Sequence, residues 1–232
     1  LNYSKHYHDL DILKKLKKNI DGLSRLSKER LFDELKKIIK IETLEKLSKD
    51  KISKELVLII FPELKNLSIF SKLNLVQRAI LKDNDFIFLL SLIIIDGTDN
   101  ADYFIFKFNI SKKNEKRIRN INNFYSKKIN SKMFSEKNFN KIFYHLGKEA
   151  VIDILNFKII KSKELNKDLL ELSKHFQNKS SPVMPVGAIE LMTKYNIPEG
   201  KQLGIKLKMI EEEWVRNNFK ISDQQIENII KN

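Results

Sequence analysis

The chain has 232 residues, 42% of them hydrophobic, and carries 44 basic against 30 acidic side chains, a formal net charge of +14. This hydrophobic content excludes a disordered tail, and the lack of cysteine excludes disulfide scaffolds and thiolate metal sites. A chain without cysteine suits a reducing compartment, so we expect a cytoplasmic protein.

Apolar residues recur at helical spacing along nearly the whole chain, whereas strand-like alternation is scarce. The chain also has only 6 glycines and 4 prolines, which is little turn chemistry for a sheet protein. Two helical stripes are especially regular, one at Leu31, Leu35, Ile38 and Ile39 and one at Leu165, Leu169, Leu170, Leu172 and Phe176. We therefore predict an all-α fold, a multi-helix elongated array with no sheet.

The longest apolar run extends from Phe86 to Ile95. It is about half of the ~20 residues that a membrane span needs, and no charged leader precedes it. The run therefore predicts a buried core helix, and we expect no membrane partner.

Several serines stand where helices are expected to begin. Ser27, Ser111 and Ser162 each precede a charged run, and Ser222 has Gln225 three residues on, as in a capping box. Helix ends are expected at Gly97, at Gly147 and in the segment from Ser180 to Pro185. We divide the chain into residues 1–75, the end of a neck and the start of a body, residues 76–180, a basic helical body, and residues 181–232, a helical tail.

Positive charge is concentrated in the middle of the chain, between Lys107 and Lys148. Two acidic residues, Glu115 and Glu136, stand there against twelve basic ones: Lys107, Lys112, Lys113, Lys116, Arg117, Arg119, Lys127, Lys128, Lys132, Lys137, Lys141 and Lys148. A lysine-rich codon bias raises the total charge but does not concentrate it in this way. We expect these side chains to contact nucleic-acid phosphates.

Aromatic residues run through the same stretch. They are Phe124, Tyr125, Phe134, Phe139, Phe143 and Tyr144. Exposed rings would stack on bases, but rings of this kind more often belong to a core, and we expect most of these to be buried.

Three short patterns receive structural interpretations. His6 to Asp9 has the residue types of a metal site but lacks further ligands, and we interpret it as a polar loop. Asp96 to Asp102 spaces oxygen atoms like a calcium loop, yet Ala101 stands where that loop needs glycine, so a capped turn between helices is expected. Arg30 and Glu34 are placed to form an ion pair within a helix.

The tail has the most specific pattern. After Pro182 and Pro185, two short helices are expected to meet at a tight turn, with Gly200 and Gly204 at the opening of the second one. Free backbone amides there, with Lys201 beside them, would form a phosphate cradle. Close helix packing explains the two glycines equally well, and both interpretations stay open.

These residues carry a resemblance to a known family. Leu26 to Ile38 resembles the neck helix of class II tRNA nucleotidyltransferases (CCA-adding enzymes) and their poly(A) polymerase relatives, in which a Ser-x-Glu-Arg step is followed by Glu-Leu. The tail from Met184 through Gly200 and Gly204 to Trp214 and Phe219 is similar to the tail of the same enzymes.

The resemblance implies a transferase that adds CCA, or A residues, to tRNA 3′ ends with Mg²⁺ and CTP or ATP. In such enzymes an N-terminal head carries the Gly-Ser or Gly-Gly motif and the metal-binding carboxylates, and neither these nor the Glu-Asp-x-x-Arg element occurs here. The chain is therefore expected to begin after the templating helix, to lack catalytic, cofactor and metal residues, and to be inactive alone. Its implied partner is tRNA, gripped at the acceptor and TψC arms.

The expected RNA-binding residues come from the basic stretch and the tail. They are Lys112, Lys113, Lys116, Arg117, Arg119, Lys127, Lys128, Gly200, Lys201 and Gly204. The alternative is a stand-alone helical domain that binds another protein, has no catalytic role and uses its lysines only for solubility.

Overall fold

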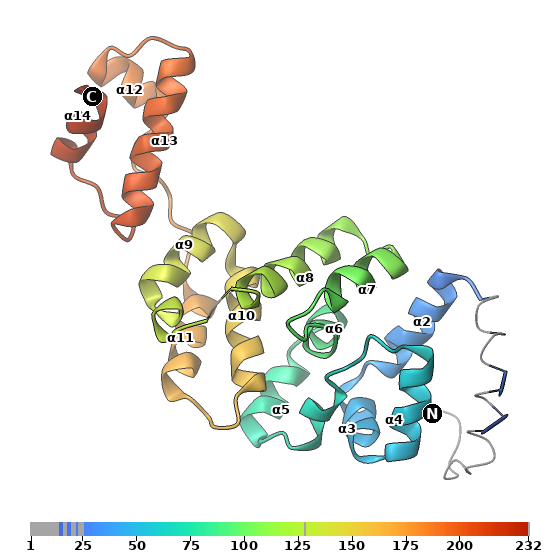
Figure 1. The fold of residues 1–232 in the computed structure, drawn as a ribbon. Helices are drawn as coiled ribbons and strands as arrows, with labels where there is room; N and C mark the ends of the chain where they lie inside the picture. The colour runs from blue at the N-terminus through green and yellow to red at the C-terminus, as the bar shows by residue number, and fades with distance from the viewer. Residues whose placement is uncertain (1–13, 16–17, 20–21, 23–25, 128, 232) are drawn as a thin grey trace. The chain divides into compact units, whose positions relative to one another are not determined.

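The computed structural model describes residues 14–15, 18–19, 22, 26–127 and 129–231. Helices make up the described part, which contains no strand, so the all-α prediction is confirmed (Figure 1). None of the described helices is both long and apolar enough to cross a membrane.

The chain divides into two compact units, and the boundaries between them fall after Lys128, within α10 (Lys148–Lys161) after Ile152, and after Lys167. Unit 1 consists of Leu1–Lys128 and Asp153–Lys167, and unit 2 of Ile129–Ile152 and Asp168–Asn232. Unit 1 contains α2 (Lys28–Ile38), α3 (Ile41–Lys49), α4 (Lys51–Ile60), η2 (Leu67–Ser71), α5 (Leu75–Lys82), α6 (Phe86–Ile94), α7 (Asn100–Phe108) and α8 (Lys112–Tyr125). Unit 2 contains η3 (Ser131–Phe134), α9 (Glu136–Leu146), α11 (Lys167–Asn178), α12 (Ala188–Tyr195), α13 (Lys201–Arg216) and α14 (Asp223–Lys231).

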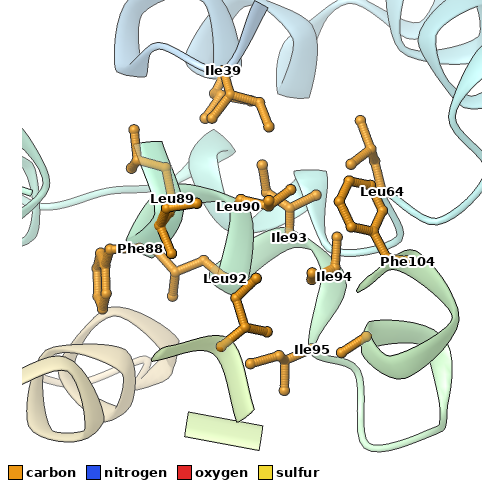
Figure 2. Close-up of a cluster of buried hydrophobic side chains, with 14 of the residues drawn as sticks. Ile39, Leu64, Phe88, Leu89, Leu90, Leu92, Ile93, Ile94, Ile95 and Phe104 are labelled. Carbon is orange, nitrogen blue, oxygen red and sulfur yellow. The ribbon is translucent and has the colours of Figure 1, made fainter. Parts of the chain in front are cut away.

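Helix α6 forms the centre of unit 1. Every residue from Ile87 to Ile94 is buried, and Ile39, Leu64 and Phe104 pack into the same cluster from other parts of the unit (Figure 2). Each such side chain contributes about 1.5–3 kcal/mol when it leaves water. The predicted core helix is thus confirmed.

Two of the predicted helix starts have the expected cap. The Ser27 hydroxyl accepts a hydrogen bond from the Arg30 amide at 3.3 Å, and Ser222 and Gln225 form the reciprocal pair of a capping box. Ser111 also stands at the N-cap of α8, but its side chain makes no cap hydrogen bond. The helix interruptions at Gly97, Gly147 and 180–185 are confirmed as well.

The predicted start at Ser162 is wrong. Helix α10 continues to Lys161, and the Ser162 hydroxyl donates to the Lys158 carbonyl at 2.8 Å, so this serine follows one helix rather than opening the next. Ile160 is buried in the core of unit 1, and the Gln77 side-chain amide lies 3.1 Å from the carbonyls of both Ile159 and Ser162. Packing and these hydrogen bonds hold the end of α10 in place, and α11 begins only at Lys167.

The turn at Asp96 is built from local hydrogen bonds, as expected. Asp96 accepts from the Thr98 amide at 3.0 Å and from the Thr98 hydroxyl at 2.7 Å, and the Thr98 hydroxyl in turn accepts from the Asn100 amide. In α2, Glu34 pairs with Lys37 at 2.7 Å, whereas its spacing in the sequence predicts a pair with Arg30. Residues 6–9 lie outside the described residues.

Unit 2 has an aromatic cluster and a small separate core in its tail. Tyr144 of α9 meets Trp214 of α13 edge to face at 5.4 Å between ring centroids, and its hydroxyl donates to Glu211. Leu191, Leu203, Ile210 and Ile226 pack together with Val186 in the tail. Helices α12 and α13 meet through a short turn at Asn196 and Gly200, both with positive φ, which confirms the predicted helix pair.

Candidate nucleic-acid interface

A groove of about 630 Å³ on unit 1 brings together α2, α7 and α8. Its polar and charged walls come from the first residue of α2, the chain between α7 and α8, and the first turns of α8. The lining residues are Lys28, Ile105, Phe106, Asn109, Ile110, Ser111, Lys112, Glu115 and Arg119. With three cations and one carboxylate, the groove carries a net positive charge.

Packing of α2 against α7 places Lys28 at this groove. The Phe32 ring lies 5.8 Å from the Phe108 ring in a stacked arrangement and 5.7 Å from the Phe86 ring edge to face. Lys28 stands one helical turn before Phe32 on the same side of α2, so it faces the same neighbour. Its Nζ atom lies 6.0 Å from the centroid of the Phe106 ring.

Helix α7 leaves the Phe106 ring in solvent while it buries its other phenylalanines. Phe104 and Phe108 are buried in the core of unit 1, whereas Phe106, two residues from each, is 79% exposed. Asn109 then takes a left-handed conformation, with φ of 46°, and ends the helix. Asparagine tolerates this conformation, and the sharp change of direction leads the chain directly into α8.

The first turns of α8 present lysines to solvent. Lys112, Lys113 and Lys116 are all exposed, and Lys112 and Lys116, one turn apart, lie on the side opposite the buried Ile118 and Ile121. The Lys112 side chain is 96% exposed and pairs only loosely with Glu115 at 3.2 Å. Because the Ser111 hydroxyl makes no cap hydrogen bond, the first-turn amides of α8 point outward beside these lysines without a side-chain acceptor from that cap.

Arg119 is held at the wall of the groove by two carboxylates. Its Nε donates to Glu115 at 2.9 Å, and its Nη1 pairs with Asp102 of α7. The hydrogen bond from Arg119, followed by that from Lys112, lowers the pKa of Glu115, which stays ionised. Arg119 thus lines the predicted surface, although much of its charge is already neutralised.

Arg117, by contrast, belongs to the interior. Its Nε and Nη2 atoms donate to the two oxygens of Asp153 at 2.6 and 2.9 Å, and its Nη1 pairs with Asp85. Burial alone would lower the pKa of this guanidinium, but the hydrogen bonds to Asp153 and the charge of Asp85 outweigh it, and the pKa is raised. Its side chain is only 12% exposed, so we assign Arg117 to the fold and leave it out of the interface.

The remaining basic residues of the stretch are divided. Lys127 is exposed just after the end of α8, away from the residues that line the groove, and Lys128 lies outside the described residues. Lys107 is bound to the buried carboxylate of Glu63 at 2.6 Å and belongs to the fold. The cations that the structure brings to the groove are therefore Lys28, Lys112 and Arg119, whereas Lys113 and Lys116 are exposed on α8 without lining it.

The three tail residues of the predicted set lie together in unit 2, at the start of α13. Gly200 is the N-cap with φ of 145°, a conformation that side chains rarely adopt, and Lys201 and Gly204 follow it in the exposed first turns. A Cβ atom added at either glycine would meet open space, so close packing does not explain Gly204. The phosphate cradle stays a prediction.

The aromatic residues of the basic stretch are mostly core, as expected. Phe124, Phe139 and Phe143 are buried, and Tyr125 is held by a hydrogen bond from its hydroxyl to the Ile154 carbonyl at 2.7 Å. Burial of that hydroxyl raises the pKa of Tyr125 well above its usual range. These rings do not offer a face to bases.

One comparison with known proteins gives a match. A family model described as "Probable RNA and SrmB- binding site of polymerase A" matches residues 9–67, about a quarter of the chain. The match supports a relation to the poly(A) polymerase and CCA-adding enzymes at this coarse level, and it supports RNA binding. No curated protein matches the chain.

The matched segment contains the neck-like helix at Leu26 to Ile38 but neither the basic stretch nor the tail. Its residue at the groove, Lys28, was missing from the predicted set, and so was Phe106 of α7. Phe106 had a signal in the sequence: at 100° per residue it stands opposite Ala101, Phe104, Ile105 and Phe108, the core side of its helix. Lys28 had no such signal in the sequence, because the ring that it lies near, Phe106, belongs to another helix.

Proposed function

We propose that unit 1 binds RNA through the groove between α2, α7 and α8, with phosphates on Lys28 and on the outer lysines of α8. The observation that carries this proposal is the meeting of two independent features on one surface. Lys28 belongs to the segment that matches an RNA-binding family model, and Lys112 belongs to the basic stretch. A net positive groove with exposed lysines attracts phosphates without sequence preference.

The finer function that fits this surface is that of a tRNA nucleotidyltransferase. We propose that the chain holds tRNA by its acceptor and TψC arms while a head domain of the full protein adds CCA, or A residues, to the 3′ end. The head would supply the carboxylates for Mg²⁺ and the site for CTP or ATP, and the enzyme would work in the cytoplasm. The resemblance at Leu26 to Ile38 and in the tail supports this assignment.

Charge reversal tests the RNA-binding surface. In the triple variant Lys112→Glu, Lys113→Glu, Lys116→Glu, tRNA affinity measured by fluorescence anisotropy at 50 mM salt should fall on the order of 10- to 100-fold. The plot of log affinity against log salt should also become flatter by about 2 to 3, because up to three phosphate contacts disappear. These lysines are exposed, so folding should be unaffected.

The matched control reverses three exposed lysines elsewhere in unit 1, Lys82, Lys163 and Lys167. Its net charge equals that of the first variant. Equal losses in both variants would mean that bulk charge alone attracts RNA, and a tRNA affinity indifferent to salt would contradict the proposal outright.

The nucleotidyltransferase assignment has its own test. The reading frame upstream should encode a Gly-Ser or Gly-Gly element followed by Asp-x-Asp within about two hundred residues, and the full protein should extend tRNA lacking its 3′ end. The chain by itself should bind tRNA without extending it. A natural start codon directly before Leu1 would contradict this assignment while leaving RNA binding intact.

A second candidate is a helical protein-interaction domain. It is favoured by apolar side chains of unit 2 that lie in solvent, above all Val183 at 84% and Ile189 at 77% exposed. On this alternative, the triple variant Lys112→Glu, Lys113→Glu, Lys116→Glu would bind the protein partner as wild type does. Added tRNA would not displace that partner.

A further inference from the structure

We propose that Phe106 is a stacking platform for an unpaired RNA base whose flanking phosphates lie on Lys28 and Lys112. This inference deepens the proposed function and rests on it: it names the kind of RNA element that the groove accepts. Stacking on an aromatic ring tolerates any base, because every base has a π-face.

The exposure of Phe106 is the first argument. A phenylalanine left 79% in water forgoes most of the stabilisation that its burial would bring, about 1.5–3 kcal/mol for a full side chain. Its helix has buried places for rings, since Phe104 and Phe108 are both in the core. Phe106 instead stands at the wall of a groove that Lys28, Lys112, Glu115 and Arg119 also line.

The surroundings of the ring are the second argument. Lys28 lies at 6.0 Å from the ring centroid, the outer limit of a cation–π contact, so its ammonium is held weakly and can turn toward a phosphate. Lys112, on the α8 side of the groove, is almost fully exposed. Cations on α2 and α8 and a ring on α7, all lining one groove, suit the repeating phosphate–base pattern of a single strand.

Polar groups of the groove complete the arrangement. Asn109 and Ser111 line it between α7 and α8, and the outward-pointing first-turn amides of α8 adjoin Lys112. Amides at a helix N-terminus donate to phosphate oxygens and add to the attraction of the lysines. A duplex keeps the faces of its bases inside its own stack, so it would use the cations of the groove but not the ring.

The test compares a short single-stranded RNA with a blunt-ended RNA duplex of the same charge, using the full chain and fluorescence anisotropy. Phe106→Ala should weaken binding of the single strand about fivefold or more and leave the duplex affinity within about twofold. The salt dependence should not change, because no phosphate contact is lost. Lys28→Met, by contrast, should change the salt dependence: the slope of log affinity against log salt for the single strand should become flatter by about 0.7, because one phosphate contact is lost.

Leu75→Ala is the matched control, since Leu75 is 85% exposed in unit 1 and does not line the groove. It should change neither affinity. Phe106→Trp provides a positive counterpart: it should restore single-strand binding, and the emission of the new indole should be quenched when the base stacks on it.

The outcomes separate the two proposals. If wild-type chain binds neither RNA, the proposed function fails. If it binds both and Phe106→Ala binds the single strand as wild type does, RNA binding stands and the stacking platform is overturned. Equal losses for the single strand and the duplex would also overturn it, because the ring would then not be stacking on unpaired bases.

Discussion

Helices α7 and α8 each have an inner and an outer side with the same residue types but opposite roles. On the inner side, Phe104 packs in the core and Arg117 is bound by Asp153 and Asp85. On the outer side, Phe106 stands in water and Lys112 is 96% exposed. An aromatic ring or a positive charge in the sequence is therefore a candidate for RNA binding only when the fold leaves it exposed.

The largest expected effect separates the two phenylalanines. Phe104→Ala should lower the free energy of unfolding by about 3–5 kcal/mol, because it leaves a cavity beside α6. Phe106→Ala should change it by no more than about 0.5 kcal/mol, since its ring has little packing to lose. Urea denaturation followed by circular dichroism measures both free energies of unfolding. Similar losses of stability in the two variants would contradict the assignment of Phe104 to the core and of Phe106 to the surface.

Arg117→Ala should lower the free energy of unfolding by about 3 kcal/mol, since it leaves the carboxylate of Asp153, 2% exposed, buried without its main partner. Lys113→Ala, an exposed residue one turn earlier on α8, should stay within about 0.5 kcal/mol. At a temperature where Arg117→Ala is still folded, its tRNA affinity should match that of wild type. A selective loss of RNA binding by Arg117→Ala with unchanged stability would return this arginine to the interface.

The smallest expected effect concerns Glu115, which accepts from both Lys112 and Arg119 and therefore competes with phosphates for them. Glu115→Gln should raise tRNA affinity about two- to fivefold at low salt, and the gain should shrink as salt rises. Glu164→Gln, an exposed residue of unit 1 outside the groove, removes the same charge and should give no such gain. Fluorescence anisotropy titrations of tRNA at two salt concentrations measure both variants. An equal gain in affinity for Glu164→Gln would contradict a specific role of Glu115.

Sequence patterns predicted the local part of the candidate site. The exposed side of α8 follows from the spacing of Ile118 and Ile121, and the concentration of lysines follows from the order of the residues alone. The same patterns did not predict that Asp153 and Asp85 bind Arg117, because these acceptors lie 36 and 32 residues away along the chain. They also misassigned Ser162, where Gln77, 85 residues away, helps to fix the end of α10.

By itself, the sequence determined the helical fold, the burial of α6 and the basic character of the middle of the chain. These features depend on periodicity and on neighbours within one or two helical turns, which any stretch of sequence contains. Only the tertiary structure decided which charges meet carboxylates and which stay free, and that Lys28, Phe106 and Lys112 share one groove. Such pairings are set by how helices distant in sequence pack together, here by the contact of Phe32 with Phe108.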